Sequence, residues 1–213
     1  MRVSILYDNE VFMKSLTADW GFSCVVEKEN APRILFDTGA NGSILLDNMK
    51  KMGIKPRSIA IVFLSHSHWD HTGGLSDFLD INSDMELFVP QDIIKYYEVK
   101  KQVSVKDPVE ISENVFSTGT LLGIEQSLVI RMDENLLVIT GCSHPGVENI
   151  LKSASQFGNP SALLGGLHGF KKFELIRDLD FICATHCTQY KQQIQNLYPD
   201  KFTGGGAGRI IEL

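Results

Sequence analysis

Three histidines and one aspartate stand within six residues of one another, directly after the apolar run Ile59–Leu64. They are His66, His68, Asp70 and His71. If the chain is extended at His66 and His68, the two imidazoles project to the same side, because side chains of an extended chain alternate. Asp70 and His71 then fall in the following turn. Imidazole nitrogens and carboxylate oxygens are ligands of borderline divalent metal ions, so this segment predicts metal binding, with room for two adjacent ions.

The other three histidines also follow short apolar runs that read as strands. They are His144 after Leu136–Thr140, His168 after Ala162–Leu164, and His186 after Phe181–Ala184. Small residues flank them, which lets the backbone approach a site closely. A lone histidine is usually a surface or core residue, but all six at strand ends is typical of a site assembled at one sheet edge. We therefore expect the remaining metal ligands to come from these distal histidines.

The elements that position these residues follow from the periodicity of the apolar side chains. Apolar, β-branched and aromatic runs predict strands at 2–7, 22–27, 33–36, 59–64, 86–89, 127–132, 136–140, 162–164, 181–184 and 210–212. Helical spacing predicts helices at 44–52, 75–79, 147–154 and 188–198. Residues 91–118 show no clear period. No linker or repeat divides the chain, so we expect one domain over residues 1–213.

Composition narrows the classes of function. The chain has 213 residues, 43% hydrophobic and 22% charged, with a net charge of −6. These values are ordinary for a globular protein, and the negative charge disfavours nucleic-acid or membrane-surface binding. No apolar stretch approaches the length of a bilayer span, and the first ten residues do not resemble a signal peptide, so we expect a cytoplasmic protein. The four cysteines form no CxxC pair and are expected to be free thiols rather than a disulfide framework.

Several motifs of the sequence resemble those of a known protein family. The run His66-Ser67-His68-Trp69-Asp70-His71 matches the HxHxDH signature of the metallo-β-lactamase superfamily. Asp37-Thr38-Gly39 resembles its first motif, and His144 and His186 resemble its third and fifth motifs. The amino-acid sequences around His144, His168 and His186 look most like those of the branch that includes the ribofuranosylaminobenzene phosphate synthase of methanopterin biosynthesis.

The resemblance implies an α+β fold, a four-layer αβ/βα sandwich with the metals at one edge between two sheets. It implies two divalent metal ions, zinc first and iron or manganese as alternatives. One ion would be held by His66, His68 and His144, and the other by Asp70, His71 and His186. Asp37 would not bind an ion itself but would orient the loop of residues 65–71, called the motif loop below. The alternative is that Asp37 only forms the turn after a strand.

One departure from the family pattern concerns its fourth motif, where most hydrolases of the superfamily carry a metal-bridging aspartate. In this chain His168 is expected to stand at the position of that aspartate. A neutral imidazole does not bridge two metal ions as a carboxylate does. The second metal site is therefore expected to be weaker or differently shaped. His168 is expected to ligate one ion or to donate a hydrogen bond to substrate, with a structural histidine as the alternative.

These residues favour a metal-dependent hydrolase acting on an ester or phosphoester of a small, possibly anionic molecule. Asp70 would hold the second ion and orient or accept the proton of the attacking water, and His168 would assist. A transferase that condenses a pterin diphosphate with an aromatic ribophosphate is the first alternative, and a non-catalytic metal-binding or sensing domain is the second.

Overall fold

Two β-sheets form the centre of the protein in a computed structural model that describes residues 1–213. The first sheet has seven strands in the order β13-β1-β2-β3-β4-β5-β6, and the second has six in the order β12-β11-β10-β9-β8-β7. The first sheet contains β1 (Arg2–Tyr7), β2 (Ser23–Glu27), β3 (Ile34–Phe36), β4 (Ile61–Phe63), β5 (Glu86–Pro90), β6 (Lys101–Val105) and β13 (Ile210–Glu212). The second contains β7 (Val109–Ser112), β8 (Val115–Ser117), β9 (Leu128–Met132), β10 (Asn135–Thr140), β11 (Asn159–Gly166) and β12 (Phe181–Thr185).

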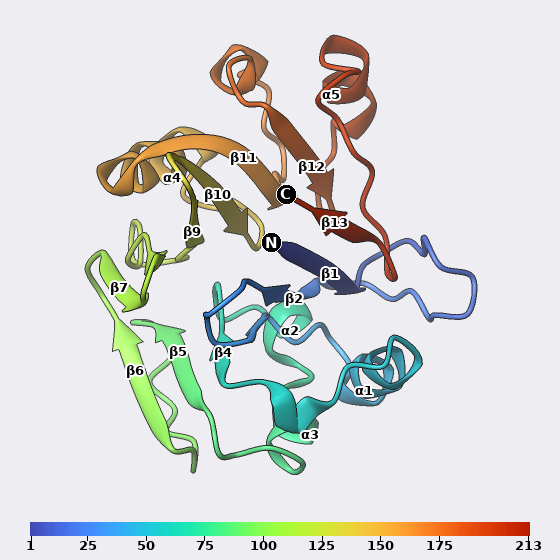
Figure 1. The fold of residues 1–213 in the computed structure, drawn as a ribbon, viewed down its shortest axis with the longest axis vertical. Coiled ribbons are helices and arrows are strands. Elements are labelled where there is room, and N and C mark those ends of the chain that lie inside the picture. Colours follow the sequence, from blue (N-terminus) through green and yellow to red (C-terminus); the bar gives the residue numbers. More distant parts are fainter.

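Helices cover the outer face of each sheet. On the side of the first sheet lie α1 (Gly42–Lys51), α2 (Trp69–Thr72) and α3 (Leu75–Leu79), and on the side of the second lie α4 (Val147–Ala154) and α5 (Lys191–Leu197) (Figure 1). Short 3₁₀ turns occupy Pro56–Ser58, Ser155–Phe157 and Phe173–Ile176. Both termini lie near the middle of the molecule, where β1 pairs with β13. No helix has the length and apolar character needed to cross a membrane.

Three separate apolar clusters explain the four layers. In β10, Leu137 and Ile139 belong to the cluster between the two sheets, whereas Leu136 and Val138 belong to the cluster under α4 and α5. A third cluster joins the first sheet to α1 and α3. Because both faces of the central strands are buried, their sequences are continuous apolar runs rather than alternating ones. The expected αβ/βα sandwich is confirmed.

Most expected elements lie where the apolar periodicity placed them, with two notable differences. The unassigned residues 91–118 contain β6, β7 and β8. Strands β6 and β7 lie at the ends of their sheets and are largely exposed, so they lack the apolar runs that mark a buried strand. The helix expected at 188–198 begins only at Lys191, because the side chain of Thr188 bonds the carbonyl of Thr185 and closes a turn first.

The sheet topology brings the polar strand ends together. Strands β3, β4 and β5 run parallel in the first sheet, and β10, β11 and β12 run parallel in the second. Parallel strands present their carboxyl ends at one edge, which is where ligand sites form in such sheets. Asp37 and His66 follow β3 and β4, and Cys142, His168 and His186 follow β10, β11 and β12.

Candidate metal centre

The first group of ligand atoms combines two histidines of the motif loop with one from the second sheet. The ligand atoms of His66, His68 and His144 all lie within 4.8 Å of one another. Nε2 of His66 is 3.1 Å from Nδ1 of His68, so the two imidazoles do lie on the same side of the loop. Nδ1 of His66 is engaged by the Ser65 hydroxyl at 2.8 Å, which leaves Nε2 for the cluster. Nε2 of His144 is buried and forms no hydrogen bond.

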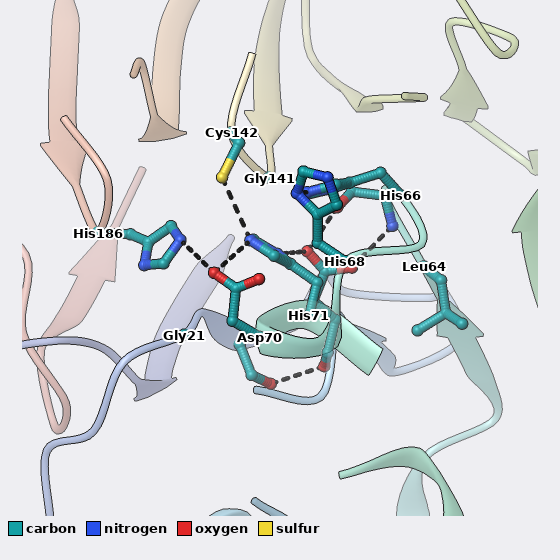
Figure 2. Close-up of polar contacts among 12 residues, drawn as sticks. Gly21, Leu64, His66, His68, Asp70, His71, Gly141, Cys142 and His186 are labelled. Carbon is teal, nitrogen blue, oxygen red and sulfur yellow. Dashed lines mark hydrogen bonds and ion pairs between the residues drawn. The ribbon is translucent and has the colours of Figure 1, made fainter. Parts of the chain in front are cut away.

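The second group lies beside the first and is more deeply buried. Asp70, His71 and His186 also place their ligand atoms within 4.8 Å of one another. Oδ2 of Asp70 is 3.7 Å from Nε2 of His71 and 3.4 Å from Nε2 of His186. Figure 2 shows the Asp70 carboxylate between the two imidazoles. Asp70 and His71 belong to α2, a single helical turn that carries both side chains toward the cluster.

Asp37 is completely buried beneath the motif loop and contacts two of its residues. Its Oδ2 atom lies 2.6 Å from Nδ1 of His71, and its Oδ1 atom accepts a hydrogen bond from the backbone N–H of Ser65 at 2.7 Å. The Ser65 hydroxyl donates to Oδ2 at 2.7 Å. These contacts orient the His71 ring and the start of the loop, which is the arrangement that ligand histidines require.

Glu125 is a buried carboxylate that sequence reasoning missed. Its Oε1 atom accepts hydrogen bonds from the backbone N–H groups of Gly141, Cys142 and Ser143, and its Oε2 atom accepts one from His144. The Thr140 hydroxyl donates to Oε1 as well. Glu125 therefore fixes the entire loop that carries His144. No local pattern marks this role, because the partners are 15 to 19 residues away.

Asn9 and Trp20 are two further residues that the sequence did not identify. Oδ1 of Asn9 lies 2.9 Å from Nδ1 of His186, which directs Nε2 of that ring toward Asp70. The indole of Trp20 is half exposed, with its ring centroid 5.4 Å from that of His186. Both residues line a cavity of about 670 Å³ that reaches His186 and is bounded on its other side by α5 and Gly204–Gly205. The cavity therefore adjoins the second group at His186.

His168 lies outside both groups. Its side chain is exposed, its ring centroid is 5.1 Å from that of His144, and both rings line a hollow of about 290 Å³. The structure thus places His168 at the rim of the cluster rather than between the two groups of ligand atoms. Its role in ligation or substrate binding stays a prediction.

Burial and neighbouring charges shift the pKa values of the cluster residues. Burial, reinforced by His71 and His144, lowers the pKa of His66 far below its ordinary value. Burial raises the pKa of Asp70, but His186 and His71 outweigh it and lower the pKa to about 2. Burial lowers the pKa of His71, but the charge and hydrogen bond of Asp37 outweigh it and raise the pKa. A neutral His66 and an ionised Asp70 are the forms that bind cations.

The backbone at the cluster is strained. Four residues that follow the site strands have positive φ angles although none is glycine. They are Asp37 (52°), Ser143 (60°), His168 (46°) and His186 (49°). Such conformations cost free energy and persist where the surrounding structure enforces them, typically at functional sites.

The donor set fits a divalent cation. Imidazole nitrogens and an ionised carboxylate face one another in the cluster, and Nε2 of both His144 and His186 is buried without a hydrogen-bond partner. Buried polar atoms without partners are rare in folded proteins unless an ion or a water satisfies them. The cluster therefore suggests divalent metal binding.

Comparison with known proteins agrees with this geometry. The profile of the metallo-beta-lactamase superfamily matches residues 21–100. The chain is 26% identical to the 7,8-dihydropterin-6-methyl-4-(beta-D-ribofuranosyl)-aminobenzene-5'-phosphate synthase of Methanocaldococcus jannaschii, over 91% of this chain and 90% of that protein. It is 27% identical to an uncharacterized protein of the same organism, over 99% of this chain and 100% of that protein.

One solved structure combines sequence and structural similarity. The crystal structure of a metal-dependent hydrolase of the beta-lactamase superfamily superposes with a TM-score of 0.78 at 25% sequence identity. The match covers 100% of this chain and 99% of that one. Fold, buried His/Asp cluster and sequence similarity agree: the chain has the metallo-beta-lactamase fold and is similar to members of the metallo-beta-lactamase superfamily, and its cluster suggests divalent metal binding.

Proposed function

We propose that this protein is a metal-dependent hydrolase with a dinuclear centre, zinc being the first expectation, that cleaves an ester or phosphoester bond in a small molecule. One observation carries the proposal: two adjacent groups of three ligand atoms share one buried cluster at the carboxyl ends of the parallel strands. The similarity to a metal-dependent hydrolase along the whole chain supports it.

Each of the two groups would hold one ion. His66, His68 and His144 would hold one, and Asp70, His71 and His186 the other. When bound, such ions supply Lewis acidity that polarises a substrate oxygen and makes hydroxide available near neutral pH.

The chain's own side chains would then position the reactants. The carboxylate of Asp70 is ionised at neutral pH, faces the cluster and is able to accept a proton from the attacking water. His168, at the rim beside His144, would donate a hydrogen bond to the substrate. The half-exposed indole of Trp20 offers a flat apolar surface next to His186 for an unsaturated or ring-bearing substrate.

A synthase-type transferase is the second candidate. The similarity to the M. jannaschii synthase, which spans nine-tenths of both chains, favours it. The cavity beside His186 has two aromatic side chains in its wall, Trp20 and Phe202, together with the amides of Asn9 and Gln189. Flat aromatic and hydrogen-bonding surfaces suit a heterocycle, and in this reaction the ions would stabilise a leaving diphosphate instead of activating water.

Metal content and turnover test the proposal together. The protein is stripped with a chelator, reloaded with zinc, manganese or iron, and tested on nitrophenyl esters, nitrophenyl phosphodiesters and lactones. We expect two ions per chain and hydrolysis that depends on them. His66→Ala is expected to lower metal content and rate together, whereas Asp47→Asn on the exposed side of α1 should change neither.

Each alternative gives a different result. Release of diphosphate only when an aromatic acceptor is added would identify the transferase and overturn the hydrolase. Two bound ions with no turnover of either kind would point to a sensing domain. A chain that binds no divalent ion would contradict all three.

A further inference from the structure

The end of β11 leaves no room for a carboxylate that would face the cluster. The strand ends in Gly165-Gly166. A Cβ atom on Gly166 would lie 2.6 Å from Sγ of Cys187 and 2.5 Å from the carbonyl oxygen of Gly141. Real Cβ atoms essentially never approach so closely, so a residue larger than glycine does not fit. The space in front of this strand end is occupied by a thiol.

A second thiol lies between the two groups of histidines. Sγ of Cys142 is 3.3 Å from Nε2 of His71, the nitrogen that faces the cluster. The ligand atoms of Cys142, His66 and His71 lie within 4.8 Å of one another, and so do those of Cys142, Cys187 and His186. His66 belongs to the first ligand group and His186 to the second, so Cys142 is within reach of both. Figure 2 shows its sulfur pointing at His71 from the second sheet.

The surroundings of these thiols differ from those of the other cysteines. Cys24 and Cys183 are fully buried members of the apolar cluster between the sheets, where a free cysteine acts as a small hydrophobic side chain. Cys142 is 4% exposed but faces imidazoles, and its backbone N–H is fixed by Glu125 at 3.0 Å. The ligand atom of His186 lies within 4.8 Å of both sulfurs, and Nε2 of that ring is buried and forms no hydrogen bond.

We propose that Cys142 is a thiolate ligand shared by the two halves of the metal centre and that Cys187 is a second thiolate ligand on the His186 side. The centre is then a mixed nitrogen, oxygen and sulfur site. Each thiol loses its proton to solvent when it binds the ion. Thiolates select zinc, cobalt or cadmium over the harder manganese and magnesium ions. This inference rests on the proposed metal binding and specifies which ions the site takes.

X-ray absorption of the zinc-loaded protein tests the proposal without any substitution. We expect a sulfur shell at about 2.3 Å in addition to nitrogen and oxygen at about 2.0–2.1 Å. Cobalt-loaded protein should show a thiolate-to-cobalt charge-transfer band. Two bound ions with nitrogen and oxygen shells only would overturn the thiolate ligands and leave the proposed hydrolase intact. No bound ion would overturn the proposed function as well.

Variants assign the sulfur shell to residues. Cys142→Ala and Cys187→Ala should each weaken the charge-transfer band and shift the cadmium-to-manganese affinity ratio toward manganese by at least 10-fold, since even supporting groups of a metal site affect affinity by about that much. Cys183→Ala is the matched control, because it truncates a buried cysteine of the apolar cluster and should change neither reading. A band and an affinity ratio that survive in both cluster variants would overturn the assignment.

Discussion

The carboxylate of Asp37 lies 2.6 Å from Nδ1 of His71, and both side chains are completely buried. The contact joins the end of β3 to α2, 34 residues further along the chain. It fixes which ring nitrogen of His71 faces Asp70 and Cys142, because the other nitrogen is already engaged. The same carboxyl group holds Ser65, whose hydroxyl in turn engages Nδ1 of His66. One aspartate therefore orients histidines of both ligand groups.

Replacing Asp37 should weaken metal binding although no ligand is removed. We expect Asp37→Asn to lower affinity by about 10- to 100-fold, the usual effect of removing a group that orients ligand histidines. Asparagine is the suitable replacement because it tolerates the positive φ angle of 52° at this position. Calorimetric titration with zinc measures the affinity, and Asp47→Asn serves as the control. Unchanged affinity would show that Asp37 only closes a turn.

Truncation of Glu125 should destabilise the fold. Glu125→Ala leaves the backbone N–H groups that precede His144 without their acceptor in a buried environment. Unsatisfied buried donors cost about 1–3 kcal/mol each, and relaxation or entering water recovers part of this, so we expect a loss of at least about 3 kcal/mol. Urea unfolding measures the difference. Glu134→Ala, in the exposed turn between β9 and β10, should remain within about 0.5 kcal/mol of the parent.

His168 should affect turnover more than metal content. We expect His168→Ala to reduce kcat while two ions remain bound, because its exposed ring lies at the rim beside His144 and outside both ligand groups. Steady-state kinetics and elemental analysis of the same sample separate the two effects. Lys171→Ala, a change in the adjacent exposed loop, is the control. Selective loss of one ion would instead make His168 a ligand, and no change in either reading would make it a structural residue.

The stability of the metal-free protein should fall as the pH is lowered from 7.5 to 5.5. Burial lowers the pKa values of His66, His144 and His186 below their ordinary 6.5, so below that pH the unfolded chain binds more protons than the folded one. Stability is then present above pH 6.5 and is lost as the pH falls below it. The pKa values of His71 and Asp37 are raised and act in the opposite direction, but they are two groups against three.

Urea unfolding of chelator-treated protein across this range measures the slope. Well below pH 6.5, His66 alone contributes about 1.4 kcal/mol per pH unit, so His66→Asn should flatten the curve. A curve that rises toward low pH would show that the Asp37–His71 pair dominates instead.

The local pattern of the sequence determined the motif and most of the framework. The spacing of His66, His68, Asp70 and His71 places four donors on one short loop whatever the rest of the chain does. Continuous apolar runs such as 59–64 and 136–140 predict strands buried on both faces, and β4 and β10 lie there. These features depend on residues close together in the chain, so the local sequence alone predicts them.

Other features depend on contacts between residues far apart in the chain. Nothing in the sequence around Glu125 distinguishes it from other polar residues. Its role comes from the tertiary structure, in which it accepts hydrogen bonds from the backbone N–H groups of Gly141 and Cys142 after β10. Cys142 follows the end of β10 and Cys183 lies inside β12, and the packing of the two sheets puts Cys142 against His71 and Cys183 in the apolar layer. His168 follows a strand as His144 and His186 do, yet its ring turns to the rim. Strand order and backbone direction at each strand end decide these positions, and no local periodicity encodes them.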